Sequence, residues 1–325
     1  MKQKDYLENL EGNMNSKKIA FLFPGQGAQA IGMAKELCEN IPECKELLER
    51  SEQILNMPIK KMMFEGPEEL LTATENAQPT ILVASLIALK ALEINGIKAD
   101  YTAGLSLGEY GSLIYGGALS LEEGLLLIKE RGRIMGSALP EGLGKMAAIL
   151  KLDDEKLKEL LDRASAFGVV EGANYNCPGQ VVISGENNAI DEAVKIAKEL
   201  GGLGKALKVS GPFHSSLLES ASEEFYNTIK TVDIKKFNKV VYSNVKGLPY
   251  EEGDDIKELL KKHIRTSVLF EKTIRDMINN GVDTFIEVGP GKALRGFVKK
   301  IDKDATLLNV EDMESLKNTI NSVNS

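Results

Sequence analysis

The sequence has 325 residues, of which 43% are hydrophobic and 27% are charged, and its formal net charge is −8 at pH 7. This balance is typical of a globular protein with a sizeable core, built as one large domain or two unequal ones. The acidic balance, without a long basic run, argues against a nucleic-acid-binding or membrane-surface protein. Three scattered cysteines and two histidines argue against a zinc site and favour a reducing cytoplasm over a disulfide framework.

The N-terminal part predicts a short leader followed by the start of a sheet. Residues 1–15 are polar and lack the apolar core of a signal peptide, so we expect a disordered leader there. A buried strand is predicted over residues 17–23, then a glycine-punctuated turn, then helical periodicity from about residue 31 to residue 55. The glycine spacing of the turn is neither GxGxxG nor GK[ST], which disfavours a phosphate loop. A long buried helix is predicted over residues 75–94, with Gln78 near its start.

The stretch Gly104-Leu105-Ser106-Leu107-Gly108 lies between a predicted strand and a predicted helix. A serine with glycine two residues before and two residues after it, at such a junction, is the signature of a nucleophile elbow. Side chains at the glycine positions would collide with the neighbouring strand or helix. The turn would expose the Ser106 hydroxyl and aim the Leu107 N–H at a developing oxyanion. The alternative interpretation is an ordinary turn that contains two glycines.

A helix from residue 121 to about residue 138 begins with a capping-box pattern, Ser-Leu-Glu-Glu. Helical spacing places Arg131 beside Ile128 and Met135, on the apolar face of this helix. An arginine in that position usually snorkels or pairs with a structural carboxylate, and less often it binds a substrate carboxylate. Periodicity favours the structural role and leaves the other open.

Residues 145–209 predict a separate unit with the order βαββαβ, which is the ferredoxin-like split arrangement. Its last strand is placed at residues 206–210. Strands and helices alternate on both sides of it, which predicts a mostly parallel sheet with both faces covered. The expected fold class is α/β, with a large α/β-hydrolase-like domain over residues 16–140 and 210–325. The small ferredoxin-like domain, residues 141–209, would be inserted into it.

A serine hydroxyl is a weak nucleophile unless a base removes its proton as it attacks. The chain offers His214, in a Gly-Pro-Phe-His loop after a predicted strand, and His263, at the end of a charged helix. We favour His214, because the end of the charged helix would satisfy His263.

Six segments, in order over residues 17–300, resemble the malonyl-CoA:acyl carrier protein transacylases and the acyltransferase domains of fatty-acid and polyketide synthases. One such motif alone would be weak evidence, but six in the family's order are specific. The segments are residues 23–27, 104–110, 131–132, 174–182, 211–215 and 287–291.

This resemblance implies that Ser106 becomes acylated and that His214 is its general base and acid. It implies an oxyanion hole formed by the backbone N–H groups of Gln26 and Leu107, and a malonyl carboxylate held by Arg131. The backbone carbonyl of His263 would orient the catalytic histidine. Residues expected to line the pocket less directly are Gln78, Asn174 and Phe213.

Two positions depart from the family's pattern. His263 stands where relatives commonly carry glutamine, a change that a main-chain role should tolerate. Leu105 stands where relatives commonly carry histidine, which affects the polarity of the pocket and therefore acyl selectivity.

The expected reaction is malonyl transfer from malonyl-CoA to acyl carrier protein in fatty acid biosynthesis. The CoA thioester would be a substrate, and we expect no permanently bound cofactor, no metal, no nucleic acid and no membrane partner. Three alternatives stay open: a serine thioesterase or esterase that uses His263 with a nearby acid, a polyketide-line acyltransferase with other acyl selectivity, and a non-catalytic module that binds carrier proteins.

Overall fold

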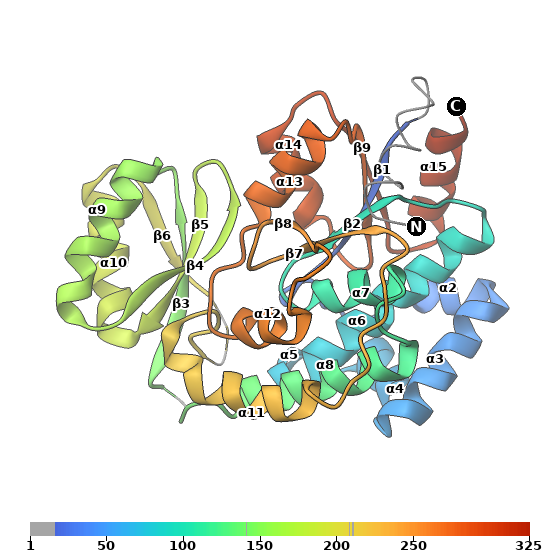
Figure 1. Ribbon diagram of the computed structural model, residues 1–325, viewed down its shortest axis with the longest axis horizontal. Coiled ribbons are helices and arrows are strands. Elements are labelled where there is room, and N and C mark those ends of the chain that lie inside the picture. Colours follow the sequence, from blue (N-terminus) through green and yellow to red (C-terminus); the bar gives the residue numbers. More distant parts are fainter. Residues whose placement is uncertain (1–16, 141, 208, 210) are drawn as a thin grey trace.

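The computed structural model describes residues 17–140, 142–207, 209 and 211–325, and it contains two sheets of very different construction. The expected leader over residues 1–15 lies outside the described residues. A six-stranded sheet with its helices forms the larger part of the molecule, and a four-stranded sheet with two helices lies at one side (Figure 1).

The elements of the larger part are β1 (Ile19–Phe23), α2 (Lys35–Asn40), α3 (Pro42–Leu55), α4 (Ile59–Glu65), α5 (Glu68–Thr72), α6 (Thr74–Ile94), β2 (Tyr101–Gly104), α7 (Gly108–Tyr115), α8 (Leu121–Gly136), η2 (Ser216–Leu218), α11 (Glu219–Ile229), β7 (Val240–Ser243), β8 (Leu248–Pro249), α12 (Ile256–His263), α13 (Phe270–Asn279), β9 (Thr284–Val288), α14 (Ala293–Ile301), β10 (Thr306–Val310) and α15 (Met313–Asn324). Those of the smaller part are β3 (Gly144–Leu150), α9 (Asp154–Ala164), η1 (Ser165–Phe167), β4 (Val170–Cys177), β5 (Gln180–Glu186), α10 (Asn187–Glu199) and β6 (Leu203–Ala206).

The large sheet has the order β10-β9-β1-β2-β7-β8, and all its pairs are parallel except β7 with β8. Alternate side chains of the central strand enter different cores. Phe21 and Phe23 pack with the cluster that contains α6, α7 and α8, whereas Ala20 and Leu22 pack with α13 and α14. Both faces are therefore covered, as expected for a mostly parallel sheet in an α/β fold.

The small sheet is antiparallel throughout and has the order β4-β5-β3-β6. One face forms its own core with α9 and α10, and residues on the other face, such as Met146 and Val182, join the core of the large part. The last strand was placed at residues 206–210, of which residues 208 and 210 lie outside the described residues. The described strand is β6, which begins earlier and ends at Ala206, so the predicted start is wrong. This edge strand is mostly exposed and therefore carries little apolar signal, so the apolar residues after it misled the prediction.

Two other local predictions need correction. The periodic stretch from residue 31 to residue 55 is broken into α2 and α3 at Ile41, whose extended backbone precedes Pro42. Proline disfavours helical geometry in the residue before it and is well placed in the first turn of the next helix. The short helices α4 and α5 were not predicted.

The helix α6 is long and apolar enough to cross a membrane by length and composition alone. However, 83% of its most apolar window is buried inside the protein, which is typical of a central core helix. Figure 1 shows it beneath the sheet, among α7, α8 and the N-terminal helices.

The turn between β2 and α7 brings main chain into contact with main chain. A methyl group at Gly104 would lie 1.9 Å from the Gly108 carbonyl carbon, and one at Gly108 would lie 2.1 Å from the Phe23 carbonyl oxygen. Ser106 has a φ of 53°, in the left-handed region that non-glycine residues rarely adopt. The two glycines therefore allow a strained turn to pack directly against the end of β1.

We expect Gly108→Ala to lower the free energy of unfolding by about 1–3 kcal/mol or more, because the added methyl overpacks a backbone contact. Gly296→Ala is the matched control, since a Cβ at this exposed position in α14 would meet nothing within 4 Å. There, alanine should be neutral or stabilising by up to about 1 kcal/mol. Urea unfolding curves of both variants test this, and equal stabilities would contradict it.

Candidate active site

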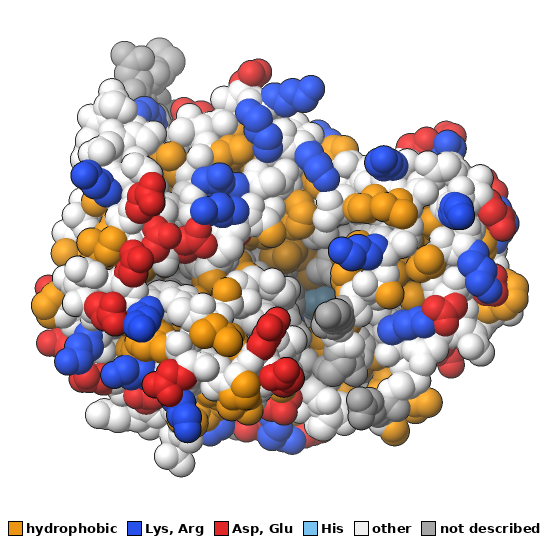
Figure 2. All heavy atoms as spheres, turned by 180° about the vertical axis from the view of Figure 1, so that it is seen from behind, with side chains coloured by type: hydrophobic (Ala, Val, Ile, Leu, Met, Phe, Trp, Pro, Cys, Tyr) orange, Lys and Arg blue, Asp and Glu red, His pale blue; other side chains and the backbone are white. Residues whose placement is uncertain are grey.

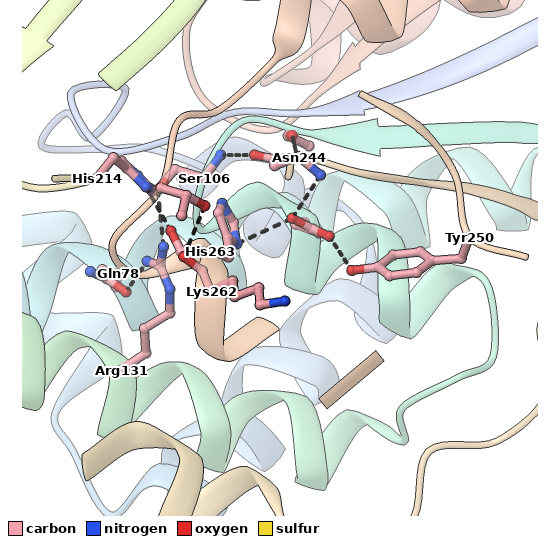
Figure 3. Close-up of polar contacts among 11 residues, drawn as sticks. Gln78, Ser106, Arg131, His214, Asn244, Tyr250, Lys262 and His263 are labelled. Atoms are coloured by element: carbon pink, nitrogen blue, oxygen red, sulfur yellow. Dashed lines mark hydrogen bonds and ion pairs between the residues drawn. The ribbon is translucent and has the colours of Figure 1, made fainter. Parts of the chain in front are cut away.

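The Ser106 hydroxyl and the His214 imidazole meet at hydrogen-bonding distance. Ser106 Oγ lies 2.7 Å from His214 Nε2, although 108 positions separate the two residues in the sequence. The serine is on the turn after β2, and the histidine is on the loop between β6 and η2 (Figure 3). Like the serine, His214 has a positive φ, 58°. Strained backbone at both residues is typical of a functional site.

The other ring nitrogen of His214 fixes its tautomer. Nδ1 lies 2.8 Å from the backbone carbonyl oxygen of His263 at the end of α12. A carbonyl only accepts hydrogen bonds, so Nδ1 carries the proton and donates it. Nε2 is then left with a free lone pair facing the Ser106 hydroxyl, as a general base requires.

The surroundings of His214 keep its ring uncharged. Burial, reinforced by the positive charge of Arg131, lowers the pKa of His214 from 6.5 to about 3. An imidazole with this pKa is free to accept a proton over the physiological pH range.

Arg131 places a buried positive charge beside the nucleophile. Its side chain is 1% exposed; Nη1 donates to Gln78 Oε1 at 2.8 Å and Nη2 donates to Ser106 Oγ at 3.1 Å. It also lies 5.7 Å from the centroid of the Tyr110 ring. Nε has no hydrogen-bond partner, and none of the ion pairs among the described residues includes this guanidinium. The buried carboxyl of Glu109 acts on this guanidinium only through space, without a direct ion pair. A buried charge without a direct partner is costly, so the site is suited to a ligand that brings a carboxylate.

The backbone around the serine offers two free N–H donors. Leu107 N precedes the first turn of α7, and Gln26 lies just after β1, whose Phe23 carbonyl accepts from Leu105 N at 3.0 Å. In the described part of the chain, neither Leu107 N nor Gln26 N donates to another group. An oxyanion hole requires free N–H groups of this kind, and the positive end of the helix that follows Leu107 would add to their effect.

The expected lining residues differ in how near they lie to this centre. Gln78 is in direct contact with Arg131. Asn174 lies on β4, where its backbone bridges to Val268, and Phe213 packs into the core of the large part. Neither of these two has a hydrogen bond to Ser106, Arg131 or His214 in the described residues.

Three residues that sequence reasoning gave no role join the site from behind. Asn244 Oδ1 accepts from Ser106 N at 2.8 Å, and its Nδ2 donates to the Gly104 carbonyl at 2.7 Å. Glu109 contacts Asn244, His263 and Tyr250 (Figure 3). One signal could have indicated Asn244: it directly follows β7, the parallel neighbour of the strand that leads to Ser106. The carboxyl ends of neighbouring parallel strands meet at one edge of a sheet.

The site lies in a hollow of the surface. Figure 2 shows this hollow between the two parts of the molecule, with a histidine side chain at its floor and hydrophobic side chains on its walls. Within the described ranges, no group of three His, Cys, Asp or Glu side chains is placed to hold a metal ion. A serine, an uncharged histidine, two free N–H groups and a buried arginine can together perform acyl transfer.

Comparison with known proteins gives consistent results. The model of the family "Acyl transferase domain" matches residues 20–317. A malonyl CoA-acyl carrier protein transacylase of Bacillus subtilis (strain 168) is 44% identical over 302 residues, which cover 92% of this chain and 95% of the relative.

Solved structures agree in fold. The crystal structure of a malonyl CoA-acyl carrier protein transacylase from Clostridium perfringens has 48% identity and a TM-score of 0.92, over 94% of this chain and 97% of the other. A malonyl-transacylase solved in complex with a type II polyketide acyl-carrier protein has 29% identity and a TM-score of 0.91, over 94% of this chain and 99% of that one.

The chain has only two histidines, so NMR can follow both rings directly. Because burial lowers both histidine pKa values, we expect neither ring to titrate between about pH 5 and about pH 8. Arg131→Ala should raise the pKa of His214, since it removes one of the two causes of the shift. A His214 midpoint near 6.5 in the unaltered protein would contradict this.

Proposed function

The chain belongs to the acyl transferase family, among the malonyl-CoA:acyl carrier protein transacylases, and we propose that it carries the malonyl group as an ester on Ser106. The protein is an acyltransferase that moves malonyl from CoA to acyl carrier protein. We also assign a catalytic role to each residue of the site, and we propose that the protein acts in fatty acid synthesis.

The assignment of catalytic roles rests on the position of the Ser106 hydroxyl. Ser106 Oγ lies between a base, His214 Nε2 at 2.7 Å, and a buried cation, Arg131 Nη2 at 3.1 Å. The base explains how the hydroxyl is activated, and the cation explains which acyl group is chosen. A simple esterase would need the first group and not the second.

In the first half-reaction, the Ser106 oxygen attacks the thioester carbonyl of malonyl-CoA while His214 Nε2 takes the hydroxyl proton. The N–H groups of Gln26 and Leu107 would stabilise the negative charge on the carbonyl oxygen. When the tetrahedral intermediate collapses, the bond from carbon to sulfur breaks. His214 gives its proton to the CoA thiolate, and CoA leaves as the free thiol.

The second half-reaction reverses these roles. The phosphopantetheine thiol of acyl carrier protein gives its proton to His214 and attacks the serine ester. The bond from carbon to the Ser106 oxygen then breaks, and His214 returns the proton to that oxygen. Malonyl leaves on the carrier, and the enzyme is restored. CoA is therefore a substrate carrier and a product in this proposal.

Arg131 would hold the free carboxylate of the malonyl group. Before substrate binds, its guanidinium donates to Gln78 and to the nucleophile itself. A carboxylate would offer it a charge-assisted and potentially two-pronged contact, stronger than either neutral partner.

We extend the proposal to domain organisation and location. The antiparallel order β4-β5-β3-β6, with helices after the first and third of its strands in the chain, supports a ferredoxin-like domain over residues 141–209. This domain would be inserted into an α/β-hydrolase-like domain over residues 16–140 and 210–325. Three buried, unpaired cysteines support a location in the cytoplasm.

The test is to incubate the protein with malonyl-CoA and to measure its intact mass. We expect one malonyl group per chain, located on Ser106 by peptide mapping, and its discharge when holo acyl carrier protein is added. Ser106→Ala should give no adduct, and His214→Ala should slow its formation by about 10²–10⁴-fold. Absence of an adduct would favour a binding module, and release of malonate with no transfer would favour a hydrolase.

Acyl selectivity tests the role of Arg131. Arg131→Ala should lower kcat/KM for malonyl-CoA relative to acetyl-CoA by about 10- to 100-fold, because a hydrogen bond to a charged group contributes about 1.5–3 kcal/mol. Arg133→Ala is the matched control, since this exposed arginine of the same helix pairs with Glu130 and Glu224. An unchanged ratio in Arg131→Ala would exclude the carboxylate role.

A further inference from the structure

A buried carboxylate, Glu109, lies behind the serine–histidine pair, and the mechanism above does not use it. Glu109 is the second residue of α7 and is 1% exposed. Its Oε1 accepts a hydrogen bond from the Tyr250 hydroxyl, and its Oε2 accepts from Asn244 N at 3.2 Å. Oε2 also lies 3.2 Å from His263 Nδ1. One carboxylate therefore contacts three residues of the segment 244–263, which lies more than 130 positions away in the sequence.

The first contact leads to the nucleophile. Asn244, whose backbone N–H is held by Glu109, receives the Ser106 N–H with Oδ1 and donates to the Gly104 carbonyl with Nδ2. These two hydrogen bonds fix the backbone at Gly104 and at Ser106, and so they hold the strained turn in place. A shift of Asn244 would therefore shift Ser106.

The second contact leads to the base. The carbonyl of His263 receives the Nδ1–H of His214, and the two imidazole rings stack with centroids 5.3 Å apart and planes inclined by 28°. The His263 side chain is fully buried, and neither of its ring nitrogens has a hydrogen-bond partner in the described structure. Its Nδ1 lies 3.2 Å from Glu109 Oε2, but no hydrogen bond joins the two groups.

The charges around Glu109 fit a supporting role. Burial raises the pKa of Glu109 to about 7, and the bonds from Tyr250 and Asn244 and the charge of Arg131 oppose that shift. Burial, Arg131 and His214 keep the pKa of His263 well below its usual value, so its ring is uncharged. Burying an ionisable carboxyl is costly. Here that cost is offset in part by the hydrogen bonds from Tyr250 and Asn244.

We propose that Glu109 is a positioning residue that holds Ser106 at reacting distance from His214 by anchoring Asn244, while its carboxylate packs against the ring of His263 (Figure 3). The proposal rests on the roles of Ser106 and His214 in the proposed function. Glu109 does not touch substrate in this account, and its effect passes through other residues.

Glu109→Gln tests this with little change of volume, because an amide offers one acceptor oxygen in place of two. We expect kcat for malonylation of Ser106 to fall by about 10- to 100-fold, since a displacement of about 1 Å can cost about 10²-fold in rate. KM for malonyl-CoA should change by less than about two-fold, because no hydrogen bond or ion pair in the described structure joins Glu109 to Arg131 and the residues that line the pocket are unaltered.

Glu287→Gln is the matched control. Glu287 is an equally buried acid on β9 whose carboxylate accepts from Leu294 N and Arg295 N, with no contact to the reacting residues. It should lower thermal stability and leave kcat per folded molecule unchanged. A purely structural role for Glu109 predicts the same result for Glu109→Gln, and that result would overturn the proposal.

A double-mutant cycle gives a second readout. If Glu109 acts through Asn244, the losses in kcat from Glu109→Gln and Asn244→Ala should combine to less than their product, whereas independent effects multiply. Losses that multiply would show that Glu109 does not act through Asn244, and they would overturn the proposal.

Two further arms keep the test decisive. If Glu109→Gln does not fold, Tyr250→Phe provides a second variant. It removes one donor to the carboxylate and should lower kcat several-fold at constant KM; an unchanged kcat would overturn the proposal.

The unaltered protein in the same assay reports on the proposed function itself. A failure there, with no adduct on Ser106, is distinct from a normal adduct that Glu109→Gln forms at an unchanged rate.

Discussion

The reacting geometry depends on one close contact, between the backbone of the turn after β2 and the end of β1. Gly108 lies so near the Phe23 carbonyl that no side chain fits between them. This contact, with the hydrogen bond from Leu105 N to the Phe23 carbonyl, holds the segment that follows β1 against the turn that carries Ser106. Since loops alone would not hold such groups to within a fraction of an ångström, the rigid parallel strands set the precision of the site.

Around this contact, burial determines which ionisable side chains are charged. Both histidines are kept uncharged, the pKa of a carboxyl is raised, and one guanidinium remains positive without a direct ion pair. In a medium of low polarisability, each of these states is determined by a few neighbours. In the proposed function, this guanidinium lies at the point where a dicarboxylic acyl group would bring a negative charge. Selectivity and reactivity would then come from the same buried environment.

Features encoded by nearby residues could be predicted from the sequence. The turn at Ser106 and the capping box at Ser120 depend on residues within four positions of each other, and both are found in the structure. The contacts of Asn244 and Tyr250 were not predicted, because they join residues more than 130 positions apart, and only the position of Asn244 after a strand could have indicated it. Arg131 shows the intermediate case: periodicity placed it on the apolar face, but only the tertiary structure shows that no carboxylate pairs with it.

The buried helix α6 has a consequence for biogenesis. It contacts α8, which follows soon after in the chain, but also β9 and α15, which are synthesised some 200 residues later. While the ribosome is still translating those segments, the part of α6 that later packs against β9 and α15 stays uncovered. The helix is apolar enough to cross a membrane by length and composition. That part of the apolar surface is covered only when the C-terminal third of the chain arrives, and exposed apolar surface of this kind favours aggregation during folding.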